Sequence, residues 1–574
     1  MLKKFRFTYL VVAFFMALAL LAGCGSSGGD GAFIPLQRTA TVEAGDAELT
    51  CADEGDMVAC RGIKYAEAER FAPPELVELE GEINARRFGN ICPQGATAFT
   101  PPGEMSEDCL SLNVFFPKGT EPDDKLPVMV WIHGGAFVTG GSSDPGYDMP
   151  ALVGKGVIVV TVNYRLGLFG FLDHESLEGD PGNYGLKDQV KALEWVQAYI
   201  ADFGGDPTNV TIFGESAGGH SVFSLLVSPS AAKLFNKAII QSGSYYPDQI
   251  SRADARTAWY NEVVNDLCGG KSDILACLRD DYTAAQIYEA GKEITPVPTT
   301  ETEFLPASTE SVLSAGGTIN ASAVMLGGNL NEGNLFVALD IFEAAAAIEE
   351  GDFSKLNMLY ITEDDYDGAV EDLFAWDPYA LDLWEDIADY YLFKQFMESG
   401  EEEDIFRKAY GSLQTDWLFN CNKLRHFDYL ADQVPTYAYW FADTVAPNPG
   451  LDLGVAGILA AVYGEGFVTT FKMLATHMLE IQYVFGSVGA RGGNADQVTL
   501  SDTMMDYWTN FAKFDNPNNG GTTWKQFSDD GFILKLVPPT PEGATGTEFS
   551  TTHSCDKWET IWAGENPFVV EVKE

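Results

Sequence analysis

A serine held between small residues is the first candidate for chemistry in this chain. Gly214–Gly218 reads Gly-Glu-Ser-Ala-Gly, with Ser216 at its centre. It follows the apolar run Val210–Phe213 and opens a helical pattern at Ala217. A sharp strand-to-helix turn of this kind lifts a serine hydroxyl off a sheet for attack on a carbonyl carbon. An ordinary glycine-rich turn is the alternative, but this context favours Ser216 as a nucleophile.

A glycine-rich turn upstream could supply donors for the negative charge that such an attack creates. Trp131–Phe137 reads Trp-Ile-His-Gly-Gly-Ala-Phe, and its glycines come directly after the apolar run Val128–Ile132 and His133. Residues without bulky side chains let backbone N–H groups approach an oxyanion. Glycine-rich turns are common, but one that precedes a nucleophile turn indicates an oxyanion hole.

The acid and the base should follow the nucleophile, because triads on this kind of sheet run serine, acid, histidine. The acid is expected on a loop after a later strand. Residues 327–333 form such a loop after the apolar run 323–326, so Glu332 is the favoured acid and Asp340 its local rival. Order alone leaves three candidate bases: His426, His477 and His553.

Apolar segments alternate with helical patterns, as in a parallel sheet covered by helices. Several segments are apolar at nearly every position, as strands buried on both faces must be. Two early segments, 40–42 and 57–60, indicate a small β-meander. The predicted class is α/β, one domain over residues 36–574 with a mostly parallel, doubly wound sheet and helical cap insertions. Strands are expected at 112–116, 128–132, 157–163, 210–213, 238–241, 323–326 and 436–441.

Acidic residues dominate the charge, with 84 Asp and Glu against 35 Lys and Arg and a net charge of −49. Such a polyanion repels phosphate backbones, so no nucleic acid partner is expected. Residues 338–404 hold 21 acidic and two basic residues, with helical runs at 340–350 and 380–398. We interpret this stretch as an acidic helical insertion. A solvated acidic surface is the main interpretation, and steering of a cationic substrate is the alternative.

Longer motifs point to a family. Asn183–Gln189 reads Asn-Tyr-Gly-Leu-Lys-Asp-Gln, residues 203–207 read Phe-Gly-Gly-Asp-Pro, and Ser106–Val114 reads Ser-Glu-Asp-Cys-Leu-Ser-Leu-Asn-Val. From about Thr39 to the C-terminus the chain resembles the type-B carboxylesterases, the family that includes cholinesterases. The resemblance implies an α/β-hydrolase fold and hydrolysis of carboxylic esters through an acyl-enzyme, with no cofactor and no metal.

The resemblance also selects site residues. The family's acid loop ends in Asn-Glu-Gly, which matches Glu332, and its catalytic histidine opens a His-x-x-Glu-x-x-Tyr-Val-Phe-Gly pattern, which His477 fits. The chain departs from the family at Met478 and Gln482, where Gly and Pro are common, and Met478 is expected to crowd the pocket mouth. The implied triad is Ser216, Glu332 and His477. The implied oxyanion donors are the N–H groups of Gly135, Ala136 and Ala217.

Two further side chains are expected to support the triad. Glu215 lies beside the nucleophile and could hold positive charge there, while Ser242 in the sequence Gln-Ser-Gly is a candidate partner of the triad acid. The remaining histidines, His426 and His553 among them, are then structural. An adhesion module that has lost catalysis and an amidase are the alternative functions, and the intact triad disfavours the first.

Nine cysteines are present, and eight of them, an even number, follow the N-terminal segment. In a protein that is exported from the cytoplasm, such cysteines can form disulfides. Spacing makes neighbours of two pairs, Cys51 with Cys60 and Cys268 with Cys277, and leaves the others open. The family resemblance implies Cys92–Cys109, Cys268–Cys277 and Cys421–Cys555, which leaves Cys51–Cys60 as the remaining pair.

The loop between Cys92 and Cys109 bears on the substrate. In cholinesterases a tryptophan within the corresponding loop stacks on a quaternary ammonium, a contact worth up to about 2 kcal/mol. Residues 93–108 contain no Trp or Tyr, and Phe99 is their sole aromatic residue. We therefore expect small uncharged esters as substrates.

The N-terminus has the pattern of an export signal. Residues 1–23 combine a basic start, an apolar run and small residues at the end. Leu-Ala-Gly-Cys at 21–24 resembles the bacterial lipobox, in which the cysteine is diacylated and becomes the new N-terminus. Simple cleavage with Cys24 unmodified is the alternative. Residues 24–35 are expected to be a flexible tether, and Gly25 after the cysteine favours an exported lipoprotein of the outer membrane.

Replacement of the predicted lipid attachment site tests this anchor. Cys24→Ser should move the protein from the membrane fraction to the periplasm or medium, because stable anchoring takes two or more acyl chains. Fractionation and immunoblotting of wild type and variant measure this. Equal membrane retention of both proteins would contradict acylation at Cys24.

Overall fold

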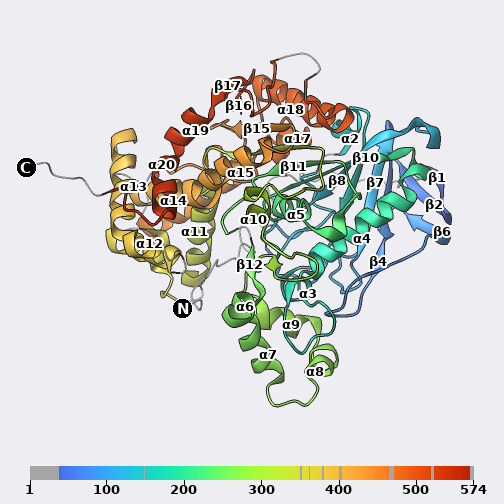
Figure 1. Cartoon of the computed structure of the whole chain (residues 1–574), viewed down its shortest axis with the longest axis horizontal. Coiled ribbons are helices and arrows are strands. Elements are labelled where there is room, and N and C mark those ends of the chain that lie inside the picture. The colour runs from blue at the N-terminus through green and yellow to red at the C-terminus, as the bar shows by residue number, and fades with distance from the viewer. Residues whose placement is uncertain are drawn as a thin grey trace, which may run out of the picture.

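The computed structural model describes residues 38–568, with short gaps at 98, 148, 248, 350–351, 361, 376, 378–379, 400–403, 464–468, 470 and 519–521. The predicted signal peptide, Cys24 and the tether lie outside these residues. Within the described part of the chain one sheet of 13 strands forms the centre (Figure 1). No helix in that part is long and apolar enough to cross a membrane.

The middle of the sheet is parallel and the edges are antiparallel. The parallel strands stand in the spatial order β9 (Ile158–Val162), β8 (Leu126–Ile132), β10 (Gly205–Glu215), β11 (Lys237–Gln241), β14 (Ala323–Asn329), β15 (Thr436–Phe441) and β16 (Phe532–Leu536). The antiparallel neighbours are β1 (Thr39–Ala44), β2 (Asp46–Asp53), β3 (Met57–Lys64) and β7 (Ser111–Pro117) at one edge and β17 (Glu542–Thr545) at the other. β6 (Glu80–Ala85) pairs with β2. The α/β prediction is confirmed, and each expected segment forms a strand; β16 and β17 were not expected.

Alternate residues of the central strands enter two different cores. On β8, Val128, Val130 and Ile132 pack on one side of the sheet, and Met129 and Trp131 pack on the other. This period of two buries both faces, which explains the nearly continuous apolar runs. The helices α4 (Tyr184–Tyr199), α5 (Ala217–Leu225) and α15 (Cys421–Ala431) cover the first face. The helices α2 (Met149–Val153), α17 (Ile481–Val484) and α18 (Ala495–Phe514) cover the second.

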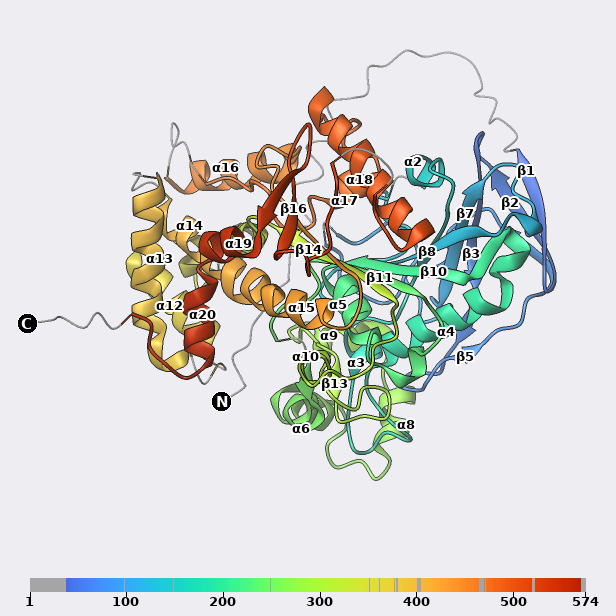
Figure 2. The same cartoon turned by 45° about the horizontal axis from the view of Figure 1, so that its top comes forward.

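A third core lies among helices at one end of the molecule, opposite the edge formed by β1 and β2 (Figure 2). The acidic stretch 338–404 supplies three of the helices given below. Two of them begin at 334 and 384, where the sequence indicated 340 and 380. They are α11 (Asn334–Glu349), α12 (Glu363–Phe374), α13 (Trp384–Ser399), α14 (Ile405–Gln414), α16 (Pro449–Tyr463) and α20 (Cys555–Trp562). A smaller core joins α7 (Asn261–Cys268), α8 (Ile274–Asp280) and α9 (Ala284–Gly291).

Disulfides link the eight cysteines of the described residues in four pairs. Two of these close short loops of nine residues, and the longest spans 134 residues and joins α15 to α20. The pairs are Cys92–Cys109, Cys268–Cys277 and Cys421–Cys555, which the family resemblance implied, and Cys51–Cys60, the remaining pair.

The carboxyl ends of the parallel strands gather the predicted site residues at one edge of the sheet. Residues 133–136 follow β8, Ser216 follows β10, Ser242 follows β11 and Glu332 follows β14. His477 comes from the segment between α16 and α17. In open α/β sheets, ligands bind outside these strand ends.

Candidate active site

Ser216 occupies a strained turn between β10 and α5. Its φ of 55° and ψ of −124° lie outside the helical and strand regions, and a residue with a side chain keeps such angles only where its surroundings hold it. The Ser216 N–H donates to the carbonyl of Gln241 at 2.9 Å, and the Ser216 carbonyl accepts from the His220 N–H at 2.8 Å. The turn is thus fixed between β11 and α5, as a nucleophile elbow requires.

His477 and Glu332 form a buried hydrogen-bonded pair. Nδ1 of His477 lies 2.7 Å from Oε2 of Glu332, and the two side chains are 5% and 0% exposed. The other carboxylate oxygen, Oε1, accepts from the Ser242 hydroxyl and from the Asn329 N–H, each at 2.7 Å. The Glu332 carboxylate is therefore held at both oxygens and can orient the imidazole.

A buried lysine also approaches this carboxylate. Nζ of Lys423 lies 3.5 Å from Oε1 of Glu332, and both side chains are fully buried. Burial opposes ionisation of Glu332, but attraction to Lys423 and the hydrogen bond with His477 hold the pKa of Glu332 well below its usual value. Glu332 is therefore a carboxylate at neutral pH. The sequence had given no sign of Lys423.

Glu215 faces the other nitrogen of the imidazole. Its Oε1 lies 3.2 Å from Nε2 of His477. Burial acts to lower the pKa of His477, but attraction to Glu215 and then the hydrogen bond with Glu332 raise it above the usual imidazole value. Within the described residues Nε2 makes no hydrogen bond, so the contact with Ser216 Oγ that a triad needs is not formed here. Such contacts commonly tighten only when substrate binds.

The predicted oxyanion loop packs against the nucleophile turn. A Cβ atom built on Gly134 would lie 3.1 Å from Cβ of Ser216. Gly135 and Ala136 have φ angles of 104° and 53°. In the described part of the chain, the N–H groups of Gly135, Ala136 and Ala217 donate no hydrogen bond. Ala217 is the first residue of α5, where helical N–H groups lack partners. These three groups can serve a ligand oxygen.

Aromatic rings enclose the imidazole of His477. The ring centres of Phe336 and Phe419 lie 5.4 Å and 5.0 Å from that of His477. Met478 packs against the same core. Gln482 is buried, and its amide donates to the carbonyl of Pro447 at 3.2 Å. Of the two departures from the family pattern, Met478 therefore lies on the apolar side near the imidazole, and Gln482 contacts the loop after β15.

A second layer of polar contacts lies behind the pair. The Asn329 amide donates to Oε2 of Glu480 and to the carbonyl of Thr476, each at 2.7 Å. The Gln241 amide donates to Oε1 of Glu480 at 3.2 Å. Burial raises the pKa of Glu480. Glu480 had no predicted role, although its spacing of three residues from His477 was a usable signal.

The rejected candidates have other partners. The Asp340 carboxylate accepts from the hydroxyl of Tyr360, and burial raises the pKa of Asp340 to about 7. Burial lowers the pKa of His426 to about 3, which keeps it neutral. His553 lies 2.7 Å from a carboxylate oxygen of Asp416. Neither histidine contacts Glu332 within the described residues.

Comparison with known proteins identifies the family of the chain. Residues 44–557 match the carboxylesterase family. The chain is 33% identical over 493 residues to the para-nitrobenzyl esterase of Bacillus subtilis (strain 168), covering 82% of this chain and 89% of that protein. It is 32% identical over 534 residues to the acetylcholinesterase of Danio rerio, covering 84% and 81%.

Solved structures give the same result. A structure named thermophylic PNB esterase superposes with a TM-score of 0.70 at 27% identity, covering 90% of this chain and 99% of the other. A structure named PNB esterase superposes with a TM-score of 0.68 at 27% identity, covering 89% and 99%. The fold is the α/β-hydrolase fold. The protein is a carboxylic ester hydrolase, and the chain belongs to the carboxylesterase family, in its type-B branch with the para-nitrobenzyl esterases and cholinesterases.

Proposed function

We propose that the protein is a serine carboxylesterase with the triad Ser216, Glu332 and His477. The observation that carries this proposal is the buried 2.7 Å hydrogen bond between His477 and Glu332, with Nε2 of His477 beside the residue that precedes Ser216. An oriented imidazole next to a serine on a strained turn is the arrangement that activates a hydroxyl group.

Acylation begins when His477 accepts the hydroxyl proton of Ser216 at Nε2 and Oγ attacks the ester carbonyl carbon. Glu332 keeps the imidazole in the required tautomer and stabilises its protonated form. His477 then gives the proton to the leaving alcohol, and the acyl group remains on Ser216. Deacylation repeats these steps with water in place of the serine hydroxyl. No step uses a metal or a cofactor.

The oxyanion of each tetrahedral intermediate is assigned to the N–H groups of Gly135, Ala136 and Ala217. Loss of one such donor costs about 3 kcal/mol of transition-state stabilisation in comparable enzymes. Support comes from the contact between the oxyanion loop and the Ser216 turn and from the absence of other acceptors for these groups in the described residues.

Glu215 and Ser242 are assigned supporting roles. Glu215, at 3.2 Å from Nε2, stabilises the imidazolium that forms during attack. Ser242 donates to Oε1 of Glu332 and so leaves Oε2 for the imidazole.

The substrate is proposed to be a small uncharged ester. The disulfide Cys92–Cys109 closes a loop without Trp or Tyr, and its one aromatic residue, Phe99, packs against the third core. A quaternary ammonium would find no tryptophan there to stack on. The acidic surface can raise the encounter rate with cations, but it supplies no binding pocket.

The protein is further proposed to act as an exported lipoprotein at the outer membrane. This proposal rests on residues 1–31: the signal pattern, the lipobox that ends at Cys24, and the Gly/Ser-rich residues that follow. A tether between lipid and domain would let the acidic domain stay away from anionic headgroups.

Removal of the nucleophile should abolish activity. Ser216→Ala should reduce kcat for p-nitrophenyl acetate by roughly 10⁶, as loss of a triad serine does elsewhere. An organophosphate should label the wild type on the peptide that contains Ser216, as read by mass spectrometry. Label on another peptide, or activity in the variant, would show that Ser216 is not the nucleophile.

Glu215 should set the acid side of the pH profile. Burial raises the pKa of Glu215 to about 8. Once ionised, its carboxylate raises the pKa of His477, so the neutral imidazole forms only at higher pH. Glu215→Gln should therefore move the acid limb of kcat/KM down by about one pH unit. Glu54→Gln, which alters an ion pair with Arg61 on β3, is the control and should leave the limb in place. An unchanged or upward-shifted limb in Glu215→Gln would refute this role.

Selectivity against choline esters tests the substrate proposal. The ratio of kcat/KM for acetylcholine to that for its uncharged isostere, 3,3-dimethylbutyl acetate, should stay below 100 at fixed ionic strength. A larger ratio corresponds to about 2.7 kcal/mol of selective transition-state binding. Such a preference would mean that a cation site exists in the protein.

A further inference from the structure

The proposed mechanism leaves the buried ammonium group of Lys423, beside the triad acid, without a role. Lys423 lies on α15 and is fully buried. Nζ is 3.5 Å from Oε1 of Glu332 and donates to Oδ1 of Asn420 at 3.1 Å. A lysine without solvent is costly unless a charge partner and hydrogen bonds hold it. Burial lowers the pKa of Lys423, and attraction to Glu332 opposes that change.

The sheet leaves room for this group at one position. A Cβ atom built on Gly328, next to the last residue of β14, would lie 1.7 Å from Nζ of Lys423 and 2.6 Å from Oε1 of Glu332. Any side chain at 328 would therefore displace the ammonium from the acid. Because Gly328 on β14 has no side chain, the ammonium of Lys423 on α15 can lie beside the triad acid.

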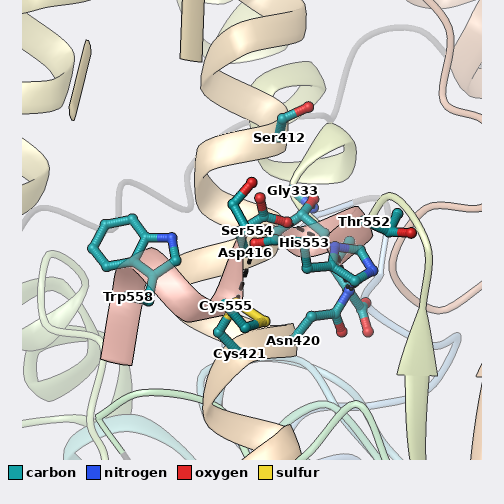
Figure 3. Close-up of polar contacts among 12 residues, drawn as sticks. Gly333, Ser412, Asp416, Asn420, Cys421, Thr552, His553, Ser554, Cys555 and Trp558 are labelled. Carbon is teal, nitrogen blue, oxygen red and sulfur yellow. Dashed lines mark hydrogen bonds and ion pairs between the residues drawn. A yellow bond between two sulfur atoms is a disulfide. The ribbon is translucent and has the colours of Figure 1, made fainter. Parts of the chain in front are cut away.

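A chain of hydrogen bonds fixes Asn420, the second partner of the Lys423 ammonium (Figure 3). The Asn420 amide donates to the carbonyl of Asn329 at 3.0 Å and lies 3.1 Å from Nε2 of His553. Nδ1 of His553 lies 2.7 Å from Oδ1 of Asp416. The next residue after Asn420 is Cys421, which is joined to Cys555. The C-terminal helices therefore hold Asn420 in place, and Asn420 gives the Lys423 ammonium a fixed partner besides Glu332.

The negative charges around His477 explain why the Lys423 ammonium is useful there. Three buried carboxylates, Glu215, Glu332 and Glu480, all raise its pKa. An imidazole that remains protonated cannot accept the Ser216 proton, and general bases work best with a pKa near the working pH. The ionisable groups that interact with these carboxylates or with Lys423 are His477, His426, His553, Tyr147, Tyr245 and Tyr439.

We infer that Lys423 is a positioning residue of the active site: its ammonium keeps the Glu332 carboxylate ionised and oriented and balances the buried negative charge around His477. Lys423 acts through Glu332 and touches no reacting atom. With Lys423, Ser242 and the Asn329 N–H all at Oε1, the oxygen Oε2 is left for His477. The inference rests on the proposed triad.

Replacement of Lys423 by a neutral side chain of similar length tests the inference. Lys423→Met should raise the acid limb of kcat/KM by about one pH unit, since loss of a nearby cation favours the imidazolium. Activity toward p-nitrophenyl acetate should fall about tenfold at pH 6 and recover as the pH rises. A purely structural role would lower activity equally at every pH. An unshifted or lowered limb would overturn the inference.

Lys237 offers a matched control. It is also a buried lysine, but it lies on the central sheet at the start of β11 and pairs with Asp515 at 2.8 Å. Lys237→Met should lower the melting temperature without moving the pH limb. A shift equal to that of Lys423→Met would overturn the inference, because any buried lysine would then have the same effect.

A further pair of variants covers the case in which Lys423→Met does not fold. Glu332→Gln leaves the buried ammonium without its charge partner, so Glu332→Gln/Lys423→Met should melt at a higher temperature than Glu332→Gln alone. An equal or lower melting temperature would overturn the inference. The activity of Ser216→Ala is measured alongside. If this variant is active, the triad itself is wrong. If it is inactive, a Lys423 result that contradicts the inference concerns the role of Lys423 alone.

Discussion

The proposed active site depends on one buried hydrogen bond, between the imidazole of His477 and the carboxylate of Glu332. These residues are 145 positions apart in sequence, and both are almost fully excluded from water. A carboxylate buried without partners carries a large desolvation cost, and so does an imidazolium. Each therefore fixes the other, and the loop after β14 and the segment before α17 must meet for either to be stable. The nucleophile turn, the second layer at Glu480 and the buried lysine are all arranged around this contact.

Strand register brings the nucleophile to that pair. Glu215 on β10 pairs with Gln241 on β11, which pairs with Gly327 on β14. The three strands are parallel, and β14 runs only two residues past this register position, so Ser216, Ser242 and the acid loop emerge at the same edge of the sheet. Ser242 stands between the nucleophile strand and the acid strand, so its hydroxyl reaches Glu332 at 2.7 Å. The sheet thus sets the spacing of the site before any side chain is considered.

The sequence predicted those features that depend on residues close together in the chain. The Ser216 turn and the acid loop each combine an apolar strand with a turn, and the strands that are buried on both faces appear as apolar runs. Contacts across the chain were not visible in this way. Lys423 lies in a helix with other polar residues and gave no sign of facing inward, because its partner is 91 positions earlier. β16 was missed as well: its lysine interrupts the apolar pattern of an otherwise typical strand. The choice of His477 came from a longer motif and not from order alone.

The disulfide between α15 and α20 has a consequence for the timing of activity. His477, the whole of β16 and the partner cysteine of Cys421 all lie in the last fifth of the chain. A chain that is still being synthesised, or that has lost its C-terminal part, carries the proposed nucleophile and acid but not the proposed base. If the proposed triad is the catalytic one, hydrolysis begins only after the C-terminal part of the chain has docked.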